Sequence, residues 1–110
     1  MKTYIIDDSS IKKSWMDKLD RGARYVILYT ADELQHMTNE DQRILMAHGI
    51  KSEFIRCLTL EDLYLQIGYQ VGRASVVGED IILVSDSEEY DKNICSWRRQ
   101  GICVNRELSG

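Results

Sequence analysis

The chain has 110 residues, of which 44% are hydrophobic and 29% are charged, and its formal net charge is −4. This length suffices for one compact domain but not for two, and the apolar content excludes a disordered chain. The sequence has no proline and no Gly/Ser tract that would mark a linker, so we expect residues 1–110 to form a single domain. The negative charge provides no general attraction to nucleic acid.

The longest apolar runs, 25–29 and 81–84, are far shorter than a membrane span of roughly 20 residues. The opening segment MKTYIIDDSS has no signal-peptide pattern. Cys57, Cys95 and Cys103 show no metal-ligand spacing, and we interpret them as reduced thiols buried in the core. We therefore expect a cytoplasmic protein with no membrane association.

Short runs rich in β-branched and aromatic residues predict five strands, and these cover residues 3–7, 24–30, 52–57, 81–85 and 102–105. Between consecutive runs, apolar residues recur at helical spacing. This alternation predicts a mostly parallel sheet covered by helices on both faces. The fold class is therefore a three-layer α/β/α sandwich, Rossmann-like in the broad sense and either flavodoxin-like or PIN-like in detail.

The first two helices are expected around residues 11–19 and 37–48. The third carries Leu60, Tyr64, Ile67 and Val71 on its apolar face, so we expect Tyr64 to be buried. The fourth is expected to bury Tyr90, Ile94 and Trp97.

Helix boundaries have recognisable residues. Glycines 22, 49 and 101 are expected to end helices in the left-handed conformation. Capping boxes are expected at Thr30/Glu33, Thr38/Asp41, Thr59/Asp62 and Ser85/Glu88.

Acidic residues follow the predicted strands at the edge where open α/β sheets bind ligands. Carboxylates that converge there suit Mg²⁺ or Mn²⁺, hard cations that prefer oxygen ligands and activate water. Helix capping is the competing explanation, and we favour it for Asp62 and Glu88. Asp7 and Asp86 are the stronger metal candidates, and the full candidate set is Asp7, Asp32, Glu33, Asp62 and Asp86.

Four segments carry a family resemblance: YIIDDSSI, VILYTADE, LYLQIGYQVGR and DIILVSDSEEYDKNICSWRRQGI. Through them nearly the whole chain resembles a PIN-like/NYN-type nuclease domain, of the compact kind common in Gram-positive bacteria and their mobile elements. The resemblance implies a metal-dependent ribonuclease in which acids from the first strand, the third-helix region and the end of the fourth strand share divalent cations.

The sequence departs from that family pattern. Asp7 matches the first-strand acid, but Ser9 and Ser10 occupy the loop where an Asn is expected, Tyr64 stands in place of an acid, and Asp86 is shifted by one residue. Each lost carboxylate removes an oxygen ligand. We therefore expect a divergent domain with weakened or lost nuclease activity that binds RNA or a protein. The alternative is an active Mg²⁺- or Mn²⁺-dependent endoribonuclease with Asp7 and Asp86 as catalytic residues.

A degenerate receiver-like signalling domain is a weaker alternative. The pair Asp7-Asp8 and Ser85 fit it, but the third strand ends at Cys57 without a phosphoacceptor Asp.

Basic residues cluster late in the chain and offer a positive patch for phosphate or an acidic partner. The competing interpretation is that these residues form an ordinary solvent-exposed helix face. The residues are Arg73, Lys92, Arg98, Arg99 and Arg106. The oligomeric state is open, and a homodimer is among the alternatives.

Overall fold

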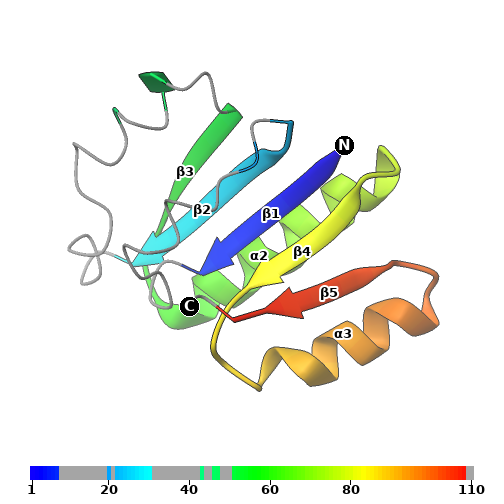
Figure 1. Cartoon of the computed structure of the whole chain (residues 1–110). Coiled ribbons are helices and arrows are strands. Elements are labelled where there is room, and N and C mark those ends of the chain that lie inside the picture. Colours follow the sequence, from blue (N-terminus) through cyan, green and yellow to red (C-terminus); the bar gives the residue numbers. More distant parts are fainter. Residues whose placement is uncertain (8–19, 21, 31–42, 44–45, 48–50, 109–110) are drawn as a thin grey trace.

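A computed structural model describes residues 1–7, 20, 22–30, 43, 46–47 and 51–108 (Figure 1). The helices predicted around residues 11–19 and 37–48, the capping boxes at Thr30 and Thr38, and Gly49 lie largely or wholly outside the described residues.

The five strands are β1 (Lys2–Asp7), β2 (Arg24–Thr30), β3 (Lys51–Cys57), β4 (Asp80–Val84) and β5 (Val104–Glu107). All neighbouring pairs are parallel and the order is β3-β2-β1-β4-β5, so every arrow in Figure 1 points toward the same edge of the sheet. This confirms the α/β class and is compatible with the predicted three-layer sandwich. The order is the Rossmann-like one and differs from the 2-1-3-4-5 order of flavodoxin-like folds, receiver domains included.

The strand order reverses between β1 and β4, which are neighbours in the sheet although they lie far apart in the chain. Their register pairs Ile6 with Val84, so Asp7, the last residue of β1, lies beside Ser85, the first residue after β4. In open parallel sheets this reversal is the topological switch point, where ligands bind beyond the carboxyl ends of the strands.

Helix α2 (Leu60–Val76) begins with the predicted capping box. The amide of Asp62 donates to Oγ1 of Thr59 at 3.1 Å, and Oδ2 of Asp62 accepts from the amide of Leu58 at 3.1 Å. These contacts satisfy amide groups that the first helical turn leaves unpaired, and they confirm the capping role.

Helix α3 (Tyr90–Arg99) is followed by Gly101, whose φ of +85° confirms the predicted left-handed turn. The helix that Gly22 is expected to end lies outside the described residues, so the role of Gly22 stays a prediction. The capping box at Ser85/Glu88 is wrong, because α3 begins at Tyr90 and the Ser85 hydroxyl bonds elsewhere.

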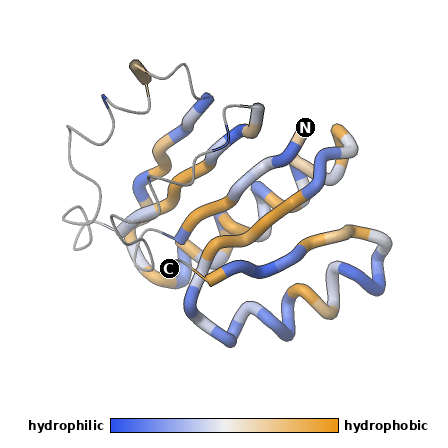
Figure 2. Tube along the Cα trace, in the orientation of Figure 1, coloured by the Kyte–Doolittle hydropathy of each residue, from blue (hydrophilic) through white to orange (hydrophobic). Residues whose placement is uncertain are grey.

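Both described helices pack on the same face of the sheet, where Leu63, Ile67 and Val71 of α2 and Tyr90 and Ile94 of α3 join one core cluster. The other face is also buried, with no more than 7% exposure of its members Ile6, Ala23, Tyr25, Ile27, Ile82 and Val84. Figure 2 shows the hydrophobic residues concentrated in the central strands, as expected of a sheet buried on both faces.

Four predictions of burial are wrong. Leu60 and Tyr64 are 54% and 41% exposed, because the sheet-facing side of α2 is centred on Leu63, Ile67 and Ala74. Cys95 and Cys103 are exposed, whereas Cys57 is buried as predicted. Trp97 is partly buried and packs against the edge of the core.

No helix in the described ranges has the length and apolarity to cross a membrane.

Candidate functional site

Asp7 lies at the switch point and is only 4% exposed. Its Oδ2 accepts hydrogen bonds from the hydroxyls of Ser85 and Tyr90, each across 3.4 Å. A buried carboxylate needs such donors, because an ionised group without them loses its hydration uncompensated. Among the described residues, the fold therefore places two hydroxyl groups against this acid.

The Ser85 hydroxyl is fixed from both sides. It donates to Asp7 and accepts from the amide of Ser87 at 3.2 Å, which closes a tight turn just after β4. Two residues further along the chain, the amide of Glu89 donates to the Ser87 hydroxyl at 3.4 Å. These bonds lead the chain from β4 into α3 and set Tyr90 above the end of β1.

Tyr90 remains a neutral phenol in this setting. Burial raises its pKa far above the ordinary value, and the neighbouring charge of Asp7 raises it further. A neutral phenol can donate its proton in a hydrogen bond, which is the form that Asp7 requires. The Tyr90 hydroxyl is thus the donor of this hydrogen bond and the Asp7 carboxylate its acceptor.

A cleft of about 190 Å³ lies beside this pair and is lined by Tyr64, Glu89, Tyr90 and Asn93. The two tyrosine rings meet edge to face with centroids 5.6 Å apart, and the hydroxyl of Tyr64 is 3.5 Å from Oε2 of Glu89. Burial and then the charge of Glu89 raise the pKa of Tyr64. The cleft therefore combines a partly exposed aromatic ring, a carboxylate and an amide.

The structure describes three of the five predicted metal ligands, namely Asp7, Asp62 and Asp86. Asp62 faces its own helix start as a cap, and Asp86 is exposed on the turn after β4. Asp32 and Glu33 lie outside the described residues. Among the residues that are described, no three His, Cys, Asp or Glu side chains are arranged to hold a metal ion. The two described donors to Asp7 are neutral hydroxyls, which add no negative charge to hold Mg²⁺ or Mn²⁺.

Cys57 ends β3 on the same edge of the sheet and is fully buried. Burial raises the pKa of its thiol, with the charges of Asp62 and Asp7 acting in the same direction. A thiol in this environment is a poor nucleophile, which favours the structural role.

The basic residues are distributed over separate parts of the fold. Arg106 is bound by Asp91, with its Nε 2.8 Å from Oδ1, and its Nη1 donates to the carbonyl of Ser85 at 3.0 Å. Arg98 donates to the carbonyl of Val104 at 3.1 Å and to Oδ1 of Asn105 at 2.7 Å. These two arginines therefore fasten α3 to β5 instead of presenting free charges.

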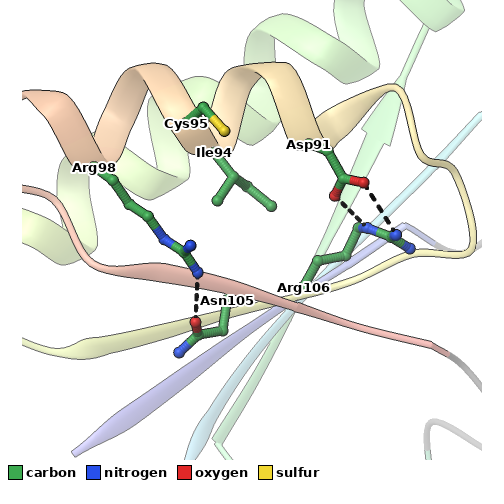
Figure 3. Close-up of a pocket in the computed structure, with 6 residues that line it drawn as sticks. All are labelled: Asp91, Ile94, Cys95, Arg98, Asn105 and Arg106. Atoms are coloured by element: carbon green, nitrogen blue, oxygen red, sulfur yellow. Dashed lines mark hydrogen bonds and ion pairs between the residues drawn. The ribbon is translucent and has the colours of Figure 1, made fainter.

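A second pocket of about 290 Å³ lies between those arginines, as Figure 3 shows. Its other lining residues include Ile94 and the exposed Cys95. Arg73 is far from this region, since it lies 3.8 Å from Glu53 of β3, while Lys92 and Arg99 are exposed on α3. The predicted positive patch is therefore not one continuous surface, because Arg73 stands apart and Arg98 and Arg106 are used within the fold.

Sequence reasoning identified Asp7 but missed its contact with Tyr90, together with the roles of Glu89 and Asn93. The apolar spacing of Tyr90, Ile94 and Trp97 assigned Tyr90 to the core, and its ring is indeed buried. The missed signal was the hydroxyl itself, because a buried tyrosine needs a partner for it.

No family model, curated protein or solved structure matches the chain. Inference about function therefore depends on the residues at the switch point.

Proposed function

We propose that the chain is a divergent PIN/NYN-like domain that has little or no nuclease activity and binds a basic segment of a protein partner at the switch point. The observation that carries the proposal is the pair of hydrogen bonds that Asp7 accepts from Ser85 and Tyr90, because these neutral hydroxyls add no negative charge beside Asp7 to hold a divalent cation.

The fold supports the family assignment in a coarse way. Rossmann-like order puts Asp7, the residue that resembles the family's first acid, at the ligand-binding edge. The contacts of Asp62 and Tyr64 support the loss of catalysis, because the first is used as a helix cap and the second is an aromatic ring.

The chemistry of the cleft favours a cationic side chain over a phosphate. The exposed acids Asp86, Glu88, Glu89 and Asp91 surround the start of α3 and repel a polyanion. An arginine or lysine that enters beside Tyr64 can donate a charge-assisted hydrogen bond to the carboxylate of Glu89 and contact the ring. Protein is therefore the favoured partner, and RNA is the second candidate.

A peptide titration tests this proposal. The probe is a short peptide with two arginines, and its matched control is the same peptide with neutral citrulline at both positions. We expect the arginine peptide to bind and the citrulline peptide to bind at least about tenfold more weakly, the factor expected when one charge-assisted bond is lost.

Variants locate the binding on the surface. Glu89→Gln removes the charge of the cleft and should weaken binding, whereas Glu53→Gln removes an exposed acid beside Arg73 and should not. Equal affinity for the two peptides, or an equal effect of the two variants, would contradict the proposal. Tighter binding to single-stranded RNA than to the arginine peptide would support the RNA alternative.

A further inference from the structure

Strand β5 lies at one end of the sheet. It pairs with β4, and no other strand of the described ranges lies along its second side. A strand in this position presents a row of backbone amide and carbonyl groups, which are a template for pairing with a strand of another molecule. The outer edge of β5 is therefore a surface where association has to be controlled.

The register of β5 shows which backbone groups face away from the sheet. The amide of Ser85 donates to the carbonyl of Glu107 at 3.1 Å, so this carbonyl points toward β4. Backbone groups of successive residues point alternately to the two sides of a strand. Asn105 therefore also points its amide and carbonyl toward β4, whereas Val104 and Arg106 point theirs outward. An added strand would pair with these outward groups.

The side chain of Arg98 lies across this edge. Its Nε donates to the outward carbonyl of Val104 at 3.1 Å, and its Nη2 donates to Oδ1 of Asn105 at 2.7 Å. Figure 3 shows the side chain reaching from α3 to β5. Asn105 is in register with Ile82, which belongs to the core cluster on the face opposite α3. The guanidinium therefore passes around the end strand, from the face that α3 covers toward the other face.

We propose that Arg98 guards the edge of β5 against strand pairing, and that the strand it excludes is β5 of a second copy of this chain. An added strand must displace the guanidinium from the carbonyl of Val104 before it can use that carbonyl. Antiparallel pairing of two β5 edges about a two-fold axis also brings the two Arg98 charges close together. Charged side chains at sheet edges prevent pairing in this way.

A second role for the same contacts has to be separated from this one. The bonds to Val104 and Asn105 also fasten α3 to β5. A fastening role predicts that loss of Arg98 lowers stability and does nothing else. The guarding role predicts that the folded variant associates. None of these residues lines the cleft beside Tyr64, so this inference does not depend on the proposed function.

Sedimentation equilibrium of Arg98→Ala over a concentration series, at a temperature far below its thermal midpoint, tests the proposal. We expect the variant to keep the circular dichroism spectrum of the parent and to self-associate at least about tenfold more tightly. Arg99→Ala is the matched control, because Arg99 is the adjacent exposed arginine of α3. Ile67→Val controls for lost stability, since it trims the buried core away from β5. Both controls should associate no more than the parent.

A second substitution shows whether the association uses the edge of β5. Asn105→Lys, added to Arg98→Ala, returns a positive charge to this strand, and pairing of two β5 edges would bring the two lysines together. We expect the double variant to associate no more than the parent. Unchanged association of Arg98→Ala would overturn the proposal, as would an equal increase in Ile67→Val. Association that persists in the double variant would overturn it as well, because it would not involve the edge of β5.

Discussion

The hydroxyl of Tyr90 donates a hydrogen bond to Oδ2 of Asp7 across 3.4 Å, and this contact joins residues 83 positions apart in the chain. It ties the first residue of α3 to the end of β1, on the far side of β4. A hydrogen bond between a phenol and a carboxylate therefore lies at the switch point.

Replacing Tyr90 by phenylalanine should reduce stability by about 0.5–1.5 kcal/mol, the usual net worth of one hydrogen bond. The ring and its packing are kept, so the change isolates the hydroxyl. Urea unfolding at neutral pH measures the effect, with Tyr69→Phe on the exposed face of α2 as the matched control. A loss no larger than that of the control would show that the Asp7 contact contributes nothing.

The same pair predicts a dependence on alkaline pH. Burial raises the pKa of Tyr90 in the folded state, whereas the unfolded residue titrates near pH 10. Above about pH 10 the unfolded state loses this proton and the folded state keeps it, so stability is full below that pH and falls above it. Tyr90→Phe should decline less between about pH 9 and 11, while Tyr25 contributes equally in both proteins. Parallel pH profiles would contradict this assignment.

An acid at position 64 tests the proposal that the chain is a divergent nuclease domain that has lost a metal ligand there. Tyr64→Asp places a carboxylate near Glu89 and should raise the affinity for Mn²⁺ in calorimetric titrations. Without metal, the variant should be less stable, because it loses a ring contact and adds repulsion between acids. Mn²⁺ should then recover stability by binding only the folded state. Tyr64→Asn is the control, since it has nearly the same shape without the charge, and equal Mn²⁺ effects in the two variants would refute the prediction.

Trp97 tests how far the core extends along α3. Its indole is partly buried against the core cluster, so Trp97→Ala should cost about 2–3 kcal/mol, less than a fully buried Trp loses. Lys92→Ala, on the exposed side of the same helix, should change stability by less than about 0.5 kcal/mol. Denaturant unfolding compares them, and similar values for the two would mean that Trp97 contributes no packing.

A substitution at Gln70 should stabilise the protein. It lies on the buried face of α2, where it is 2% exposed, and its Oε1 has no hydrogen-bond partner among the described residues. Gln70→Met keeps the length of the side chain and removes the unsatisfied oxygen, so stability should rise by about 1 kcal/mol. Thermal unfolding measures this, and a loss of stability would show that the amide has a partner the structure does not reveal.

The strands and the two described helices could be predicted from the sequence, because β-branched runs, apolar spacing and the Thr59 cap are local signals. The order of the strands in the sheet could not be predicted. Parallel pairing joins segments that are distant in the chain, and the alternation of strands and helices in the sequence fits more than one order. Tyr64 shows the limit for helices, because Leu63 and Tyr64 are adjacent and only packing decides which of them faces the sheet.

The candidate site was predictable only in part. Asp7 follows from its position at the end of the first strand, but its two hydroxyl donors come from residues about 80 positions away. The prediction that the arginines form a free positive patch failed for a similar reason. Arg98 and Arg106 appear as free charges in the sequence, yet their partners are brought to them by the packing of α3 on β5.

We propose that the switch point binds a partner without cleaving RNA, and an RNA cleavage assay tests this proposal. Purified protein is incubated with labelled single-stranded and structured RNA in the presence of Mn²⁺, beside an Asp7→Asn/Asp86→Asn double variant. The account predicts that neither protein cleaves either RNA above background. Cleavage by the parent protein that disappears in the double variant would contradict it and would establish the alternative of an active metal-dependent ribonuclease.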